Sequence, residues 1–406
     1  MSFIIQLYKN AYAGLSRETW FLSLVVLINR SGTMVIPFMS MYAIKELHFS
    51  VIQAGIIMAL FGLGSIVGAF LGGKITDKIG FQSVQLFALF GGGVIFISIS
   101  FLTTFLTLSI GCFVLSCINE SFRPANSIAI ATYSLPENRT RSYSLNRLAI
   151  NLGWALGGAI GGLLAAKSYT LIFWVDGSTN ILSAIMLMIV LPYKKIVKPK
   201  HSSIREKNKL ESNSAYKDKK YLFFILCTIL FAFCFFQMFT IFPIYLVKQL
   251  KISEEKYGFL MAFNGLLIVV LEMILIYNLE KTRNPMRFIA YGVLLVGMSY
   301  ALLNVTNGTF FIAFLSIIII TFGEMLSMPF MNTFWIGRSS DHNRGQYAAM
   351  YTMGWGIAQV SGPFTGGWVA DHYGFNVLWW IILALSTMSA IGFYFLTRKH
   401  SVQVVS

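Results

Sequence analysis

Residues 51–80 read VIQAGIIMALFGLGSIVGAFLGGKITDKIG, a long apolar run followed by a short polar turn. The run from Val51 to Leu71 carries no charged side chain. An α-helix needs about 20 mostly apolar residues to cross the hydrocarbon core of a bilayer. We therefore predict a membrane-spanning helix over Val51–Leu71 that ends at the polar turn 73–80.

The whole chain has the composition of a protein whose solvent is mainly lipid. Of its 406 residues, 56% are hydrophobic and 12% are charged, and the mean hydropathy is +0.69. Soluble globular proteins have about 25% charged residues. The 34 glycines and 36 phenylalanines are typical of helices that pack together in a membrane. The composition therefore predicts an all-α membrane protein.

The same reading, applied along the chain, predicts twelve membrane-spanning helices. These spans are Trp20–Ile44, Val51–Leu71, Val84–Phe105, Leu108–Tyr133, Leu145–Ala165, Leu171–Pro192, Leu222–Val247, Tyr257–Tyr277, Arg287–Leu303, Thr309–Trp335, Ala348–Ala370 and Val377–Leu396.

The distribution of basic residues predicts the orientation of these spans. Segment 193–220 has ten Lys or Arg and three acidic residues, and it supplies +7 of the net charge of +15. The loops after spans two, four, eight and ten are also basic. Basic loops stay in the cytoplasm, so we expect both termini there, in a bacterial-type inner membrane. Because this charge lies in loops rather than on a soluble domain, we do not expect nucleic-acid binding.

An internal repeat relates the two halves of the chain. Tyr42 and Leu47 recur at an offset of 203, Glu120 at 204 and Asn138–Arg139 at 205. Steady offsets over separated regions indicate two six-helix halves of one fold. We therefore predict two pseudo-symmetric bundles around a central cavity, which is a transporter arrangement. The expected domains are an N-terminal bundle 1–192, a basic cytoplasmic linker 193–220 and a C-terminal bundle 221–406.

The loop after the second predicted span carries a family signature. It reads Gly73-Lys74-Ile75-Thr76-Asp77-Lys78-Ile79-Gly80. It resembles the G-x-x-x-D-R/K-x-G-R/K-R/K loop of the major facilitator superfamily, matching at Gly73, Asp77, Lys78 and Gly80, whereas Phe81 and Gln82 replace the last two basic residues. The resemblance implies alternating access, with this loop bracing one conformation through charge contacts to a neighbouring helix end.

Two glycine-rich stretches occupy the fifth and eleventh predicted spans. They resemble the glycine-rich fifth-span motif of the superfamily's exporters. Small residues at i and i+4 allow close helix contact, and proline permits a bend. The stretches are either static packing surfaces or surfaces on which the halves move. Their residues are Gly157, Gly161, Gly162, Gly362, Pro363, Gly366 and Gly367.

Ionisable side chains inside the predicted spans are the candidate site residues, because each is costly in lipid. Glu324 lies near the middle of the tenth span, and a carboxyl group in a low dielectric binds a proton more readily than one in water. Glu120 and Arg123 share a helix face, so they form an ion pair or contact substrate. The candidates are Arg30, Glu120, Arg123, Glu272 and Glu324, with Asp176 as an additional one that we expect near a membrane face.

Several classes of function are not expected from the sequence. The five histidines fall in predicted loops or tails without metal-ligand spacing, and the four cysteines lie in apolar runs. We expect no phosphate-binding loop, no cofactor, no metal and no enzyme activity.

The resemblance is strongest to the twelve-span drug:proton antiporters and weaker to proton-coupled peptide carriers. It implies proton-coupled export of amphiphilic or cationic molecules by a monomer, with Na⁺ as the alternative coupling ion. Soft aromatic walls would suit such substrates, unless these side chains face lipid. The other hypotheses are a symporter of peptides or other zwitterions and a non-transporting receptor. The proposed wall residues include Phe231, Phe233, Phe235, Phe236, Met238, Met325 and Met328.

Overall fold

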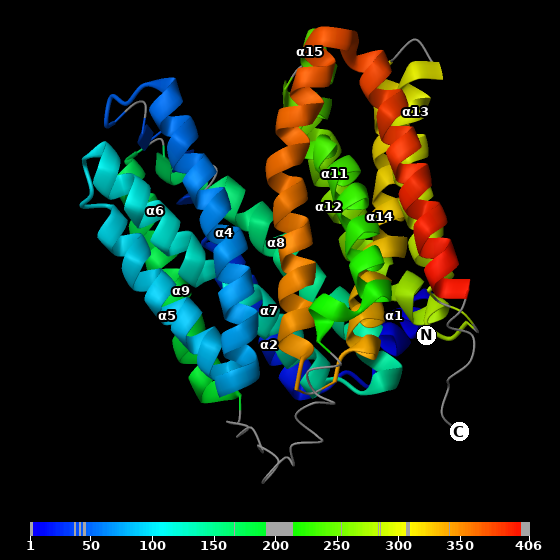
Figure 1. Ribbon diagram of the computed structural model, residues 1–406, viewed down its shortest axis with the longest axis horizontal. Helices are drawn as coiled ribbons and strands as arrows, with labels where there is room; N and C mark the ends of the chain where they lie inside the picture. The colour runs from blue at the N-terminus through cyan, green and yellow to red at the C-terminus, as the bar shows by residue number, and fades with distance from the viewer. Residues whose placement is uncertain are drawn as a thin grey trace. The chain divides into compact units, whose positions relative to one another are not determined.

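The described part of the chain is entirely helical in the computed structural model (Figure 1). The structure describes residues 3–35, 38–39, 42–43, 46–165, 167–191, 214–252, 254–282, 284, 286–305, 309–340 and 342–398. Most of the predicted linker therefore lies outside the described residues.

The α-helices follow the apolar runs of the sequence. They are α1 (Phe3–Tyr12), α2 (Arg17–Ser31), α4 (Val51–Ile79), α5 (Phe81–Ile99), α6 (Phe105–Glu120), α7 (Phe122–Tyr133), α8 (Arg139–Ala165), α9 (Tyr169–Val190), α11 (Lys219–Lys248), α12 (Glu254–Leu279), α13 (Arg287–Val305), α14 (Phe310–Arg338) and α15 (Arg344–Arg398). Two short 3₁₀ helices, η1 (Pro136–Asn138) and η2 (Ala215–Lys217), precede α8 and α11.

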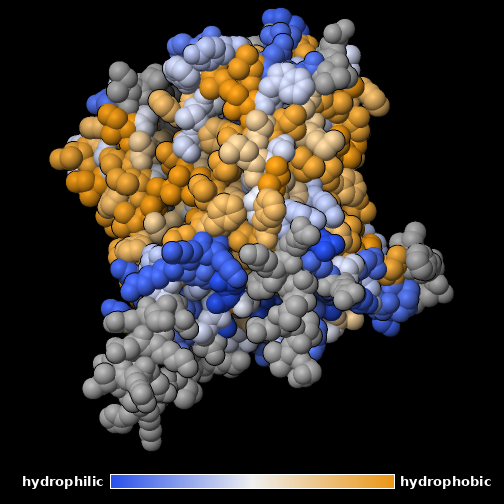
Figure 2. All heavy atoms as spheres, turned by 45° about the vertical axis from the view of Figure 1, so that its right-hand side comes forward, coloured by the Kyte–Doolittle hydropathy of each residue, from blue (hydrophilic) through white to orange (hydrophobic). Residues whose placement is uncertain are grey.

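Many of these helices could cross a membrane. Within the described residues, nine pass by length and hydropathy, or ten if the bent pair α1 and α2 forms one span. The segment Phe105–Tyr133 counts as one of them although Ser121 separates α6 from α7. In α15, Gly374 has a φ of 84°, so two helical segments meet there. Figure 2 shows apolar side chains over much of the visible helical surface and hydrophilic ones towards its upper and lower ends. The count of twelve spans stays a prediction.

The chain divides into two compact units. The N-unit comprises Gly14–Lys217 and Ser339–Met353. The C-unit comprises Met1–Ala13, Asp218–Arg338 and Gly354–Ser406. The N-terminal helix α1 thus belongs with the second half of the sequence, and the beginning of α15 belongs with the first half.

Close helix packing in the N-unit depends on a glycine row in α4 that the sequence analysis did not single out. Gly64, Gly68 and Gly72 are spaced four residues apart and lie on one face of the helix. A Cβ atom at Gly64 would lie 2.5 Å from the carbonyl oxygen of Phe113, and one at Gly68 would overlap the carbonyl of Cys117. The two backbones can approach this closely only because glycine has no side chain.

The same helix end occurs once in each unit. His48 has a φ of 55°, and Lys251, its repeat equivalent, has a φ of 54°. Before each of them two backbone N–H groups bond to one tyrosine carbonyl, that of Tyr42 in the N-unit and that of Tyr245 in the C-unit. A left-handed residue is a common way to end a helix and to satisfy its last carbonyls. The sequence repeat is therefore matched by a repeated backbone conformation.

Aromatic packing follows the repeat as well. In the N-unit the ring of Tyr42 contacts that of Phe173, with centroids 4.9 Å apart. In the C-unit the ring of Tyr245 contacts that of Trp379 at 5.4 Å. Both contacts are edge-to-face, which is a favourable arrangement of aromatic rings.

Candidate functional site

Three of the predicted site residues lie in the N-unit at α2, α6 and α7. The Nε atom of Arg123 lies 2.8 Å from Oε2 of Glu120, so the predicted pair forms. Arg30, in the last turn of α2, is buried and interacts electrostatically with both residues. A Cβ atom at Gly153 of α8 would lie 2.6 Å from Cβ of Arg30. The three charged side chains therefore form one group, which carries a formal charge of +1 when all are ionised.

Asp176 of α9 is fully buried, so its side chain is not at a solvated helix end. Its carboxylate accepts hydrogen bonds from the backbone N–H of Met34, at 3.0 and 3.1 Å, and from that of Val35, at 2.8 Å. The helix α2 ends at Ser31, so the first predicted span is interrupted there. Asp176 binds backbone donors that the interruption frees, and burial of this charge is offset by those contacts.

Glu324 of α14 accepts a hydrogen bond from a neighbouring helix of the C-unit. The side-chain amide of Asn264, on α12, donates to Oε1 of Glu324 at 2.6 Å and to Oγ1 of Thr321 at 2.9 Å. All three residues are buried, and Glu324 is only 4% exposed. A hydrogen bond between an amide and a carboxylate at this depth fixes the orientation of both side chains.

Glu272, also on α12, is 1% exposed and lies beside the N-terminal helix. Its carboxylate interacts electrostatically with Tyr12 of α1. The hydroxyl of Tyr8, one turn earlier, donates to the backbone carbonyl of Val270 at 2.6 Å. The helix α1 therefore covers the part of α12 that carries Glu272.

The loop signature holds the beginning of α15 within the N-unit. Oδ1 of Asp77 accepts from the backbone N–H of Gly345 at 2.7 Å, and Oδ2 accepts from that of Gln346 at 3.1 Å. A carboxylate at this position satisfies unpaired donors of the first helical turn and interacts with the helix dipole. Gly73 packs directly against Gly345, where no side chain would fit.

The two positions that depart from the family pattern have packing roles. The ring of Phe81 contacts that of Tyr133, with centroids 5.7 Å apart. The side chain of Gln82 donates to the backbone carbonyl of Leu191 at 3.2 Å. Gly80 has a φ of 96°, a conformation that favours glycine, and Lys78, two residues earlier, is exposed.

The comparisons with known proteins identify the family. The sequence profile of the Major Facilitator Superfamily matches residues 19–340. The chain belongs to this superfamily. It is therefore a multi-pass membrane transporter.

Three curated relatives and one solved structure illustrate the similarity. The Bacillus subtilis MFS-type transporter YqjV is 25% identical, covering 94% of this chain and 93% of the relative. A Na⁺, Li⁺, K⁺/H⁺ antiporter of Planococcus maritimus is 24% identical over 92% and 93%. The quinolone resistance protein NorA of Staphylococcus aureus is 23% identical over 74% and 76%. The E. coli fucose:proton symporter FucP has the same fold, with a TM-score of 0.74, 12% identity and coverage of 93% and 98%.

The glycine-rich stretches of this superfamily member contact helices of their own units. In the N-unit, a Cβ atom at Gly157 would lie 3.0 Å from the carbonyl oxygen of Ser31, and one at Gly161 would lie 3.1 Å from Cβ of Met34. In the C-unit, Gly362 and Gly366 lie against the side chain of Gln237. These contacts show close packing within each unit.

Three further residues of these stretches lie within α8 and α15. The nearest atom to a Cβ at Gly367 is Cδ1 of Ile241, at 3.7 Å, an ordinary contact. Gly162 lies within α8. Pro363 lies within α15, whose one non-helical residue in the described range is Gly374.

Most of the predicted wall side chains of the C-unit are buried inside the protein. Phe231, Phe235, Met238 and Met325 are buried, and the other three are partly buried. The ring of Trp355, on α15, contacts those of Phe231, Phe235 and Phe236 with centroids 5.8 to 6.1 Å apart. These side chains form an aromatic cluster inside the C-unit.

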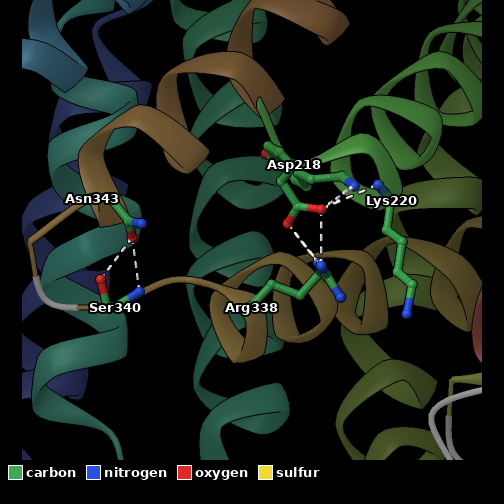
Figure 3. A network of polar contacts seen from close by, with 6 residues as sticks. Asp218, Lys220, Arg338, Ser340 and Asn343 are labelled. Carbon is green, nitrogen blue, oxygen red and sulfur yellow. Dashed lines mark hydrogen bonds and ion pairs between the residues drawn. The ribbon is translucent and has the colours of Figure 1, made fainter. Parts of the chain in front are cut away.

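The last residues of the basic linker form hydrogen bonds both before and after the point in the chain where the N-unit ends and the C-unit begins. In the N-unit, Ser214 and Ala215 donate to Oε1 of Gln346 at 3.1 and 3.3 Å. In the C-unit, Asp218 caps the first turn of α11 and forms a bidentate ion pair with Arg338, with Nη2 and Oδ2 2.7 Å apart (Figure 3). The chain therefore leaves one unit and enters the other at anchored residues.

Asn138 and its repeat equivalent Asn343 both lie in the N-unit and form the same kind of hydrogen bond. Oδ1 of Asn138 accepts from the backbone N–H of Leu135 at 3.1 Å, ahead of α8. Oδ1 of Asn343 accepts from that of Ser340 at 2.8 Å, ahead of α15 (Figure 3). These side chains close the turns that lead into the two glycine-rich helices.

The structure thus brings the candidate residues together in separate groups. Arg30, Glu120 and Arg123 form one group in the N-unit, whereas Glu324 and Glu272 lie in the C-unit with different neighbours. The sequence analysis missed Asn264 and Thr321. The sequence did contain a signal for Asn264. A side-chain amide inside an apolar span is expected to form a hydrogen bond with a neighbouring helix.

Proposed function

We propose that this chain is a proton-coupled secondary transporter that exports amphiphilic or cationic small molecules by alternating access. In this scheme Glu324 exchanges a proton for a cationic substrate, and Glu272 assists. Arg30, Glu120 and Arg123 form a polar group in the first half that responds to the protonation state. The two halves act as six-helix bundles joined by the linker, with both termini in the cytoplasm.

The burial of Glu324 in the middle of α14 carries this proposal. Its carboxyl group is 4% exposed and accepts a hydrogen bond from a neutral amide. A buried carboxyl group that binds and releases a proton during the transport cycle is what a proton-coupled carrier requires. The neighbouring amide of Asn264 holds the carboxyl group in position.

Similarity to named relatives supports both parts of the proposal. One relative is an antiporter that exchanges monovalent cations for protons, and another is a quinolone resistance protein. The aromatic cluster around Trp355 supports a preference for amphiphilic or cationic substrates, since aromatic faces attract cations. We place the protein in the bacterial inner membrane as a functional monomer, and Na⁺ is the alternative coupling ion.

The charge of the N-unit group favours one alternative function. Arg30 is buried next to Arg123, and Glu120 supplies one negative charge to the two cations. An excess positive charge at this depth suits a substrate carboxylate. The alternative is therefore a proton-coupled symporter of peptides or other zwitterions, in which the two arginines hold the carboxylate and Glu324 holds the amine.

Flux through proteoliposomes under an imposed pH gradient tests the proposal. The purified chain should move a fluorescent lipophilic cation against its gradient in exchange for protons. Glu324→Gln should reduce this flux to the level of empty liposomes, while Glu137→Gln, at an exposed position of η1, should leave it unchanged.

The same liposomes separate the two functions. Proton influx that starts when a dipeptide is added, with no movement of the lipophilic cation, would favour the symporter. Movement of neither compound, although both bind, would favour a receptor and would contradict transport of these substrate classes.

A further inference from the structure

The side-chain amide of Asn264 forms hydrogen bonds to two residues of α14, and one of them is Glu324. Its amide nitrogen lies 2.6 Å from Oε1 of Glu324 and 2.9 Å from Oγ1 of Thr321. Asn264 comes from α12, whereas the other two residues lie one turn apart on α14. One side chain therefore connects two helices through two hydrogen bonds.

The hydroxyl of Thr321 fixes which end of the Asn264 amide faces the carboxylate. This hydroxyl donates its hydrogen to the backbone carbonyl of Ile317 at 2.6 Å. Its oxygen can then only accept, so the group that faces it must be the NH₂ of Asn264. Because the same NH₂ carries a second hydrogen, it donates to Glu324 at the same time.

The repeat shows that this arrangement is specific to the second half. At the offset of 203, the residue equivalent to Asn264 is Phe61, and at 204 the equivalent of Thr321 is Cys117. The position equivalent to Arg123 is Ser327, whose hydroxyl donates to the backbone carbonyl of Gly323 at 2.8 Å. In the first half the glutamate pairs with Arg123, and in the second half the glutamate accepts a hydrogen bond from Asn264.

We propose that Asn264, oriented by Thr321, is a positioning residue that sets the pH at which Glu324 releases its proton. This inference rests on the proposed role of Glu324 in proton coupling. An N–H group that donates to a carboxylate stabilises the ionised form relative to the protonated form. The amide therefore keeps proton release within the pH range in which the transporter operates, at a site where lipid-like surroundings oppose ionisation.

Other titratable groups on the neighbouring helices lie elsewhere. Glu272 is eight residues from Asn264 on α12, about 12 Å along the axis. On α13, Tyr291 is 49% exposed, and Tyr300 follows Ser299, whose carbonyl binds Ser316, eight residues before Glu324. On α11, the thiol of Cys234 donates to the carbonyl of Ile382 on α15. Asn264, in contrast, donates a hydrogen bond directly to the carboxylate.

An infrared titration of the carboxyl band in the purified, membrane-reconstituted protein tests the inference without any substrate. The band of Glu324 is obtained by subtracting the titration of Glu324→Gln from that of the native chain. Asn264→Leu should move the midpoint of this band to higher pH by about one unit, the worth of one hydrogen bond to an ionised group. Thr321→Val should move it in the same direction by less.

A matched control lies on the same helix. Asn278 is exposed and donates to the carbonyl of Ile274 in its own helix, so Asn278→Leu should leave the midpoint unchanged. The pH profile of driven flux should shift with the band in Asn264→Leu and Thr321→Val. The second variant keeps the test available if the first does not fold.

The outcomes separate this inference from the proposed function. A Glu324 band whose midpoint is the same in the native chain, Asn264→Leu and Thr321→Val would overturn the positioning role alone. The absence of any titrating band in the difference between the native chain and Glu324→Gln would overturn the role of Glu324 itself, and the inference with it.

Discussion

The two halves of the chain carry a buried glutamate at the same place in the repeat but surround it differently. Glu120 forms an ion pair with Arg123, close to a second cation, Arg30. Glu324 accepts a hydrogen bond from Asn264. A neighbouring cation favours the ionised form of a buried carboxylate more strongly than one amide donor does. This difference is the basis for our proposal that Glu324, rather than Glu120, couples protons to transport.

The largest loss of stability should follow from removal of the buried carboxyl group of Asp176 in the N-unit. Asp176→Ala removes the acceptor of the backbone N–H groups of Met34 and Val35 inside the protein. We expect a loss of about 3 kcal/mol in unfolding free energy, because hydrogen bonds to charged groups are each worth about 1.5–3 kcal/mol. Thermal unfolding in detergent, followed by reaction of the buried thiols of Cys112, Cys227 and Cys234 with a fluorescent probe, measures this.

Asp371→Ala is the control, because this aspartate is exposed. An Asp176→Ala protein that unfolds at the native temperature would show that the interruption of the first span does not depend on the carboxylate.

The next effect compares the two glutamates directly. Glu120→Gln leaves the cations Arg30 and Arg123 without their anion and should cost about 2 kcal/mol, since Arg123 is partly exposed. Glu324→Gln should cost less than about 1 kcal/mol, because the amide oxygen of glutamine still accepts from Asn264. The same thermal assay ranks the two variants.

Removing the excess charge sharpens this comparison. Glu120→Gln combined with Arg123→Gln should recover part of the stability lost in the single variant. Equal unfolding temperatures for the two single glutamate variants would remove the distinction between a structural and a functional carboxylate.

A smaller effect is expected at the loop signature. Asp77→Ala removes the acceptor for the backbone N–H groups of Gly345 and Gln346 and should cost about 1 kcal/mol, the usual value of a helix cap. Asp77→Asn keeps one acceptor oxygen and should cost less. Identical unfolding of native and Asp77→Ala proteins would show that the beginning of α15 is held by its other contacts.

The smallest effect is a change in titration. Burial, together with the nearby Asp77 carboxylate, raises the pKa of the Tyr216 hydroxyl, whose ring contacts that of Phe70. A negative charge disfavours the phenolate, so Asp77→Asn should lower this pKa towards the ordinary value for tyrosine. Ultraviolet difference titration against Tyr216→Phe measures it, and a pKa that does not fall would mean that Asp77 does not act on the linker end.

Some of this structure was accessible from the sequence because it depends on local spacing. Apolar runs of about 20 residues gave the long helices, and an i, i+3 spacing gave the pair of Glu120 and Arg123. The offsets of the repeat also predicted matching positions, such as the turns closed by Asn138 and Asn343.

Other features depend on contacts between distant residues. Asp176 binds backbone N–H groups more than 140 positions earlier, at a break that an uninterrupted apolar run conceals. The hydrogen bond between Asn264 and Glu324 depends on which face of α12 points toward α14. A helix that is apolar on all sides has no distinct polar face from which that orientation could be predicted. The placement of α1 beside Glu272 likewise brings together residues from the beginning of the chain and from its second half.

Substrate flux in proteoliposomes that contain Glu120→Gln or Glu324→Gln tests the central claim most directly, measured with a pH gradient and as exchange without one. We predict that Glu324→Gln retains exchange but loses all gradient-driven flux, whereas Glu120→Gln, where folded, remains driven by the gradient. Gradient-driven flux that survives in Glu324→Gln and disappears in folded Glu120→Gln would contradict the assignment of proton coupling to the second half.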